Sequence, residues 1–175
     1  YRDPGSQTGP ALVIATLCFA YQIYCDFSGY SDIAVGAARV LGVRLSTNFN
    51  RPYAATSIAE FWRRWHISLS TWFRDYVYLP LGGNRVPARR WTINILIVFA
   101  ISGLWHGADW KFLVWGLIHG VCLIGERALP ASIPGLRRLP AALTWLATFL
   151  VVNAAWIFFR AASLEEALLI FRRLP

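Results

Sequence analysis

Long apolar stretches separated by short polar breaks dominate this 175-residue chain. The main runs are residues 11–24, 91–105, 110–125 and 140–159, and the last is long enough to cross a membrane as one helix. Runs of about 15 residues reach roughly 23 Å at 1.5 Å per residue, less than the roughly 30 Å hydrocarbon core. We therefore expect helices that their neighbours extend, or a bilayer that is locally thin.

Residues 60–81 have a different pattern, EFWRRWHISLSTWFRDYVYLPL, in which aromatic and charged residues are mixed. The segment is amphipathic and too polar to span, so we expect it in the membrane interface or re-entering the membrane inside the protein. Either Ser57 or Thr56 could cap its first helix, and Glu60, three residues after Ser57, fits a capping box. Ser163 and Glu166 predict a second capping box before a short amphipathic helix.

The composition places the chain among integral membrane proteins with an all-α fold. It is 57% hydrophobic and 15% charged, whereas globular chains average about 25% charged residues. The net charge of +8 would suggest a nucleic-acid partner in a soluble protein. Here the apolar runs make cytoplasmic loops and lipid phosphates the better explanation, so we expect membrane lipids and no nucleic acid as partners.

Basic residues suggest how a multi-pass chain is oriented. Eight arginines lie between residues 44 and 90, and the positive-inside rule places that segment on the cytoplasmic side. A hairpin over 91–125 would bring Arg127, Arg137 and Arg138 to the same side. A single crossing by 140–159 would leave three later arginines outside, so that helix is alternatively re-entrant or tilted. The chain starts with Tyr and contains no Met, so we expect it to be part of a longer one.

Two of the three histidines, His66 and His106, directly follow a tryptophan, and Asp109 lies three residues after His106. An isolated histidine is more often structural, but ionisable groups inside a membrane mark a site or a pathway by default. HExxH, HxH and CxxC are absent, so no metal site is expected. GxSxG is absent too, which leaves a covalent serine intermediate unsupported. General-base catalysis remains, in which a neutral imidazole takes the proton of a hydroxyl that attacks an activated acyl carbon.

Three ordered motifs carry a resemblance to a known family: YCDFSGYSDIAVGAARVLGVRLSTNFNRPY, SIAEFWRRWHISLSTWFRDYVYLPLGGNR and SGLWHGADWKFLVWGLIHG. They resemble the bacterial membrane-bound O-acyltransferases, especially the alginate O-acetyltransferase type, over about residues 21–120, with a weaker match at WIFFRAASLEEAL. The resemblance implies a polytopic helical protein of the bacterial inner membrane, with helices around a central tunnel. It also implies that residues 1–175 form the C-terminal part of a single domain.

The resemblance assigns the two functional positions of that family to His106 and His66. It implies that the acyl donor comes from the cytoplasmic side and the acceptor hydroxyl from the other. We expect His106 to act as the base and His66 to orient the acceptor or the acyl carbonyl. Asp109 has at most an orienting role, and His119 is expected to face a neighbouring helix.

The remaining candidates stay open between a structural and a functional reading. Arg63, Arg64 and Arg74 either anchor the protein to lipid or hold the phosphates of a donor such as acetyl-CoA, which would be a substrate and not a bound cofactor. Four polar residues between the first two apolar pieces are expected to cap and pair helices, or to hold Arg39 and Arg44: Asp26, Ser28, Ser31 and Asp32.

The leading functional hypothesis is transfer of acetyl groups to an exported, alginate-like polysaccharide. Its partners would be the acyl donor and a periplasmic or extracellular acceptor or relay protein. Three alternatives stay open. They are D-alanyl transfer toward teichoic acid, a transporter that uses His106 and the acids as a proton relay, and a non-catalytic scaffold of an export complex.

Overall fold

The computed structural model describes residues 4–132, 135 and 139–175, and this part of the chain contains helices and loops but no β-strand. The elements in chain order are α1 (Gly9–Val40), η1 (Pro52–Ala54), α2 (Ile58–Arg64), α3 (Ile67–Phe73), the π-helical turn η2 (Arg74–Tyr78), α4 (Ala88–His106), α5 (Trp110–Ser132), α6 (Ala141–Arg160) and α7 (Leu164–Arg173). The predicted all-α fold class is confirmed.

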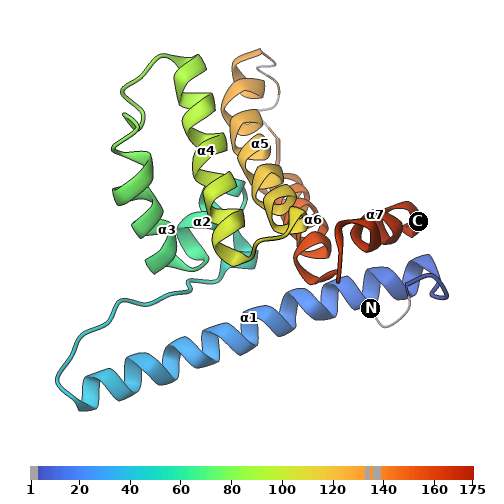
Figure 1. Cartoon of the computed structure of the whole chain (residues 1–175), viewed down its shortest axis with the longest axis horizontal. Helices are drawn as coiled ribbons and strands as arrows, with labels where there is room; N and C mark the ends of the chain where they lie inside the picture. The colour runs from blue at the N-terminus through green and yellow to red at the C-terminus, as the bar shows by residue number, and fades with distance from the viewer. Residues whose placement is uncertain (1–3, 133–134, 136–138) are drawn as a thin grey trace.

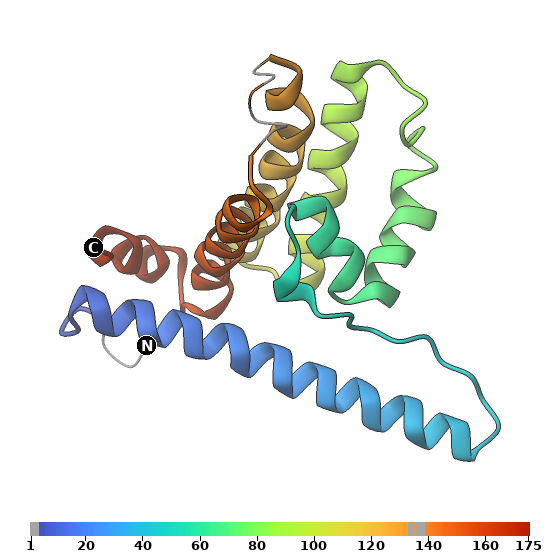
Figure 2. The ribbon, with the colours of Figure 1, turned by 180° about the vertical axis from the view of Figure 1, so that it is seen from behind.

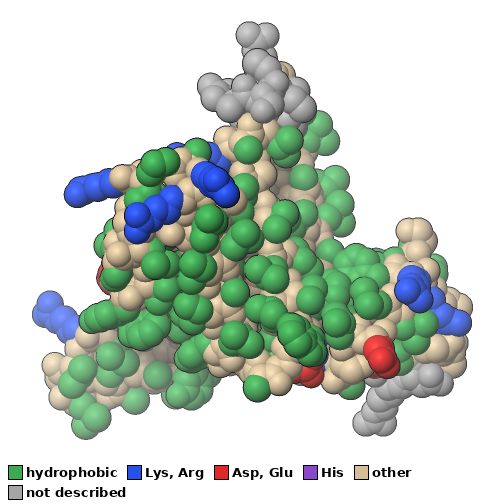
Figure 3. Space-filling view, turned by 45° about the horizontal axis from the view of Figure 1, so that its top comes forward, with side chains coloured by type: hydrophobic (Ala, Val, Ile, Leu, Met, Phe, Trp, Pro, Cys, Tyr) green, Lys and Arg blue, Asp and Glu red, His purple; other side chains and the backbone are tan. Residues whose placement is uncertain are grey.

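Three helices are long and apolar enough to cross a membrane: α1, residues Trp110–Leu129 of α5, and α6. The apolar run that begins at residue 110 is thus extended by its neighbours, as expected. The helix α4 is not among the three, and Arg89 and Arg90 lie in its first turn. Hydrophobic side chains cover much of the face seen in Figure 3, with Lys and Arg toward its upper left and right margins. These features are those of an integral membrane protein.

The helices α4 and α5 form an antiparallel hairpin, the arrangement considered for residues 91–125, and α6 packs against α5 (Figure 1). The long helix α1 runs across the lower ends of this group in Figure 1, with α7 beside its first half, and the view from behind agrees (Figure 2). The hairpin is close-packed because glycines face the partner helix. A Cβ atom on Gly116 would overlap the carbonyl oxygen of Phe99, and one on Gly103 would overlap that of Phe112.

Polar residues do not interrupt the first helix. The two apolar pieces on either side of residues 25–32 belong to one continuous helix of 32 residues, α1. Asp26 and Asp32 are exposed, so their carboxylates need no partner in the core. Ser31 is buried and accepts a hydrogen bond from Asn48 Nδ2 (3.3 Å), which ties the far half of α1 to the segment that follows it.

Both predicted capping boxes are present, each with its carboxylate shifted by one residue. Ser57 Oγ accepts the backbone N–H of Glu60 (3.0 Å), and the Glu60 carboxylate accepts the N–H of Thr56 (2.7 Å). Ser163 Oγ accepts the N–H of Glu166 (3.2 Å), whose carboxylate accepts that of Ala162. These bonds satisfy donors that a helix leaves free at its first turn, so α2 and α7 begin where predicted.

The amphipathic segment 60–81 is a broken path and not a single helix. It forms α2, α3 and η2, which pack against α4 and α5. Tyr53 lies in η1, which packs against α2, and links it to two long helices. Its hydroxyl donates to the Ala20 carbonyl of α1 (2.7 Å) and accepts from Trp156 Nε1 of α6 (3.2 Å).

The eight arginines of residues 44–90 do not gather at one place. The chain leaves the far end of α1, passes through α2 and α3, and reaches the opposite end of the hairpin before α4 begins (Figure 1). Arg85, Arg89 and Arg90 lie near that opposite end, where α5 also finishes, and Arg127 belongs to the same end. Arg137 and Arg138 lie outside the described residues.

Candidate active site

The two histidines chosen from the sequence line one pocket, although 40 positions separate them. The pocket has a volume of about 160 Å³. Its walls come from α1, the α2–α3 break, the end of α4 and the end of α6, through Ile23, Phe27, Trp65, His66, Trp105, His106, Trp156 and Phe159. We call it the histidine pocket. Aside from the two imidazoles, its walls are hydrophobic or aromatic.

His106 is the last residue of α4, and its ring is held by its own helix. Its Nδ1 lies 2.7 Å from the carbonyl oxygen of Ser102, one turn earlier. A carbonyl oxygen can only accept, so Nδ1 carries the ring proton and Nε2 keeps a free lone pair in the neutral form. Trp105 and Trp115 pack edge-on against the ring with centroids 4.9 Å away. With its proton on Nδ1, the neutral ring can accept another proton at Nε2, as a general base must.

His66 lies at the break between α2 and α3, with left-handed backbone angles (φ 44°, ψ 54°). Such angles are rare for a residue other than glycine and are concentrated at functional sites. Its ring contacts Phe27 of α1 (centroids 4.6 Å apart). Burial, with a smaller contribution from the nearby His106, lowers the pKa of His66 to about 4. His66 is therefore neutral at physiological pH.

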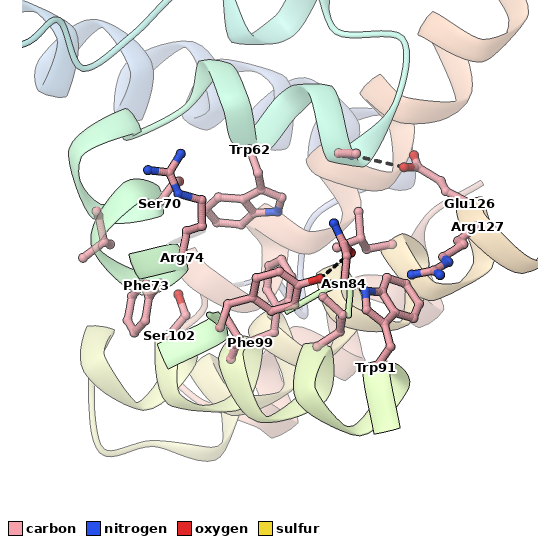
Figure 4. A pocket seen from close by; sticks show the side chains of 16 residues that line it. Trp62, Ser70, Phe73, Arg74, Asn84, Trp91, Phe99, Ser102, Glu126 and Arg127 are labelled. Atoms are coloured by element: carbon pink, nitrogen blue, oxygen red, sulfur yellow. Dashed lines mark hydrogen bonds between the residues drawn. The ribbon is translucent and has the colours of Figure 1, made fainter. Parts of the chain in front are cut away.

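A second, larger cavity of about 500 Å³ lies between α2, α3, α4 and α5. Its walls are mostly apolar and aromatic, and its charged side chains are Arg74, Glu126 and Arg127. Figure 4 shows Arg74 and Arg127 on opposite sides of the labelled group, with Trp62, Phe99 and Asn84 between them. We call it the four-helix cavity.

Ser102 connects the two hollows. It lines the four-helix cavity, and its carbonyl oxygen holds the Nδ1 of His106, which lines the histidine pocket. Ser102 thus links the wall of the four-helix cavity to the ring of His106.

The three arginines proposed for donor binding have different surroundings. Arg74 lines the four-helix cavity and is paired with Asp75 (2.7 Å), whose pKa this pairing lowers. Arg64 is paired with Glu60 (2.7 Å), and Arg63 is exposed; neither lines either hollow.

Sequence reasoning missed Arg127 as a site residue and counted it only for topology. It lines the four-helix cavity and lies over the Trp91 ring, 4.2 Å from its centroid. Only its helical spacing from the apolar positions of α5 could have hinted at this, because α2 and α4 complete the cavity.

Asp109 occupies the N-terminus of α5, where its carboxylate accepts the backbone N–H of Lys111 (3.0 Å). This is the position of a helix cap. The Lys111 ammonium donates to the carbonyl oxygen of Ala161, which follows α6. Asp109 therefore ties the turn after His106 to α5, and Lys111 ties the start of α5 to the end of α6.

Glu126 is a further residue that the sequence did not single out. Its two carboxylate oxygens accept the backbone N–H groups of Ile58 and Ala59, the first two residues of α2. The carboxylate completes the cap that Ser57 begins and holds α2 against α5. The helix so held carries Trp62 into the four-helix cavity and ends next to His66.

His119 faces neighbouring helices, as predicted. It is fully buried, stacks on Phe61 of α2 (centroids 6.0 Å apart) and meets Trp62 edge-on (5.1 Å). Within the described part of the chain, neither of its ring nitrogens has a hydrogen-bond partner. In the same part of the chain, no three His, Cys, Asp or Glu side chains are grouped so that they could share a metal ion.

Comparison with known proteins identifies the family. The model of the membrane-bound O-acyltransferase family matches residues 7–164, nearly the whole chain. The chain belongs to this family. The match includes both residues of the histidine pair and every residue that lines the four-helix cavity.

Individual relatives of this chain carry acyltransferase names. It is similar to the peptidoglycan O-acetyltransferase of Helicobacter pylori (46% identity over 160 residues, 91% of this chain and 30% of that protein). It is also similar to the "Probable alginate O-acetylase AlgI" of Azotobacter vinelandii (47% over 154 residues, 88% of this chain and 30% of that protein). A teichoic acid D-alanyltransferase of Streptococcus thermophilus is 35% identical over 113 residues, 61% of this chain and 27% of that protein. The chain thus spans about 30% of the length of these relatives.

Proposed function

We propose that the full-length protein is an O-acyltransferase that moves an acetyl group from a cytoplasmic donor to a hydroxyl of an exported polysaccharide, with His106 as general base. One observation carries the proposal: the Nδ1 proton of His106 is donated to Ser102, so Nε2 is the free basic nitrogen of a ring that lines the histidine pocket. Relatives named for O-acetyl transfer to peptidoglycan and alginate support the choice of group and acceptor class.

The reaction needs neither a metal nor a covalent enzyme intermediate. The acceptor oxygen attacks the carbonyl carbon of a thioester donor such as acetyl-CoA while its proton moves to His106 Nε2. The carbon–sulfur bond breaks, the ester forms, and the imidazolium returns the proton to the leaving thiolate. The apolar surroundings keep the resting ring neutral and keep out water that would hydrolyse the donor.

The two hollows suit the two substrates. In this proposal the four-helix cavity takes the acyl donor, because it is large, mostly apolar and carries Arg74 and Arg127. A guanidinium group can bind a phosphate oxygen pair through two hydrogen bonds. The histidine pocket takes the acceptor hydroxyl, which comes from the side of α1. The acceptor is presented either by the polysaccharide itself or by a relay protein on that side.

We assign the protein to the bacterial inner membrane, with several crossings. The positive-inside rule would place the end of the α4–α5 hairpin that carries Arg85, Arg89, Arg90 and Arg127 in the cytoplasm. The four-helix cavity then receives its donor from the cytoplasm, because Arg127 and Asn84 line it at that end.

D-alanyl transfer toward teichoic acid is the second candidate, favoured by the 35% identity with a teichoic acid D-alanyltransferase. It would use the same base and the same proton path with a different acyl group. Supplying vesicles that contain the full-length protein with radiolabelled acetyl or D-alanyl donors separates the two. Label should appear in the ester product from the acetyl donor alone.

The test of the mechanism is acyl transfer by full-length His106→Gln in vesicles at matched protein levels. Glutamine can still hydrogen-bond but cannot take a proton near neutral pH, so transfer should fall by about a hundred- to ten-thousand-fold. Asp109→Asn is the comparison on the same turn: asparagine still caps α5, and its effect should be much milder. Wild-type turnover by His106→Gln would exclude the general-base mechanism.

A further inference from the structure

Asn48 lies in the extended segment between α1 and η1, and its side chain meets His66. The amide Oδ1 is 3.2 Å from His66 Nδ1 and 3.2 Å from the backbone nitrogen of Ser68, and it accepts the Ser68 hydroxyl (2.9 Å). A backbone N–H can only donate, so the atom that faces it is the amide oxygen and not the amide nitrogen. The Nδ2 group then points to Ser31 Oγ of α1 (3.3 Å).

This arrangement decides the tautomer of the second histidine. Since Asn48 Oδ1 can only accept, His66 Nδ1 carries the ring proton and Nε2 has the free lone pair. We propose that Asn48 is the positioning residue of His66: it takes the Nδ1 hydrogen bond and so presents Nε2 to the histidine pocket as an acceptor. Its meaning for catalysis rests on the proposed acyl transfer.

The position of the ring proton decides which role His66 can take. The carbonyl oxygen of an acyl group would need a donor, which a neutral ring with its proton on Nδ1 does not offer at Nε2. A hydroxyl of the acceptor does fit. Asn48 therefore selects between the two roles expected for His66 and assigns it to the acceptor.

The backbone around Asn48 is held independently of its side chain. The Asn48 carbonyl accepts the N–H of Ile67 (2.9 Å), and the N–H of Asn50 donates to the Arg64 carbonyl (2.9 Å). These two bonds fasten the segment to both sides of the α2–α3 break. A substitution at position 48 should thus change the environment of His66 without releasing the segment.

One titratable side chain lies among those of the elements packed against His66. These elements contribute Phe27, Ser31, Asn48, Ser68, Trp105 and His106. His106 is the titratable member of this set, and it disfavours a charge on His66. A carboxylate at position 48 would be a new opposite charge beside Nδ1.

The experiment compares Asn48→Asp, Asn48→Ala and wild type in the full-length protein, reconstituted in vesicles. A carboxylate beside Nδ1 stabilises the imidazolium, so the acid limb of the pH–rate profile should move up by about 1–3 pH units, with activity recovered at alkaline pH. Asn48→Ala loses the hydrogen bond and should lower kcat/KM about tenfold at every pH without that shift. Asn50→Asp is the matched control, because Asn50 is exposed two residues away and should leave the profile unchanged.

A second readout does not depend on catalysis. Diethyl pyrocarbonate modifies the neutral imidazole, so the pH at which His66 becomes reactive, followed by mass spectrometry of its peptide, reports its protonation. Asn48→Asp should raise that pH and Asn50→Asp should not; an unshifted His66 in Asn48→Asp would overturn the assignment. If the shift is present but the wild type transfers no acyl group, the proposed function fails while the Asn48–His66 pairing stands.

Discussion

Hydrogen-bond partners distinguish the histidines that can act from the one that cannot. His106 and His119 both lie in apolar helices among tryptophans, but His106 donates from Nδ1 to Ser102 and lines a pocket. His119 is fully buried in an aromatic stack and lines neither hollow. A general base must lie within hydrogen-bond reach of the proton that it takes. The proposed mechanism therefore uses His106 and His66, which line a pocket, and not His119.

Also at the scale of single residues, arginine substitutions distinguish donor binding from lipid anchoring. Arg74→Ala and Arg127→Ala should each raise the KM for the acyl donor about tenfold, because a charge-assisted hydrogen bond contributes about 1.5–3 kcal/mol, and should leave acceptor use nearly unchanged. Arg63→Ala is the control, since Arg63 is exposed and lines neither hollow. Steady-state kinetics with varied donor concentration measures these KM values. Equal KM values in all three variants would show that Arg74 and Arg127 anchor the protein to lipid and do not bind the donor.

Helix contacts at the element scale determine where the site residues lie. The short helix α2 would be marginal alone, because seven residues complete few intrahelical bonds. Glu126 of α5 and Ser57 satisfy its first donors, and Phe61 is buried against the core. The hairpin of α4 and α5 is close because Gly103 and Gly116 have no Cβ to separate the backbones. The chain after α2 carries His66 and the end of α4 carries His106, and both line the histidine pocket.

Gly116→Ala should therefore weaken the hairpin. Its Cβ would overlap the Phe99 carbonyl oxygen, and overpacking of this kind typically costs about 1–3 kcal/mol. The thermal midpoint of the detergent-solubilised full-length protein should fall. Gly36→Ala is the matched control on α1, where a Cβ meets nothing within 4 Å, and it should be neutral or stabilising by up to about 1 kcal/mol. Equal midpoints would show that the helices can move apart without loss.

At the scale of the whole molecule, α4 contributes walls to both the four-helix cavity and the histidine pocket. It belongs to a helical group that α1 crosses below (Figure 1). The basic end of the α4–α5 hairpin and the turn between α6 and α7 lie at opposite ends of that group. An enzyme that takes its donor from one side and its acceptor from the other needs such an arrangement, with the base between them.

Cysteine labelling in intact cells tests the orientation. In a background with the native cysteines replaced, Ala88→Cys at the start of α4 should react with a membrane-impermeant thiol reagent only after the membrane is opened. Ala162→Cys, between α6 and α7, should react without opening. Both positions are exposed in the structure. The reverse pattern would place the four-helix cavity on the acceptor side and exclude a cytoplasmic donor entering there.

The sequence alone determined the membrane class, the helical fold and both capping boxes, because these depend on local patterns: apolar runs and cap residues three positions apart. The resemblance of its motifs to a family assigned the two pocket histidines, and a hairpin over residues 91–125 was one topology that the apolar runs allowed. Tertiary structure alone decided that α1 is continuous, that Arg74 and Arg127 share a cavity while Arg63 and Arg64 lie elsewhere, and that Glu126 caps α2. It also decided the tautomer of His66 and the partner of Glu126, because these contacts join residues 18 and 68 positions apart in sequence. Such contacts arise only when separate segments pack together, whereas His106 finds its acceptor one turn earlier in its own helix.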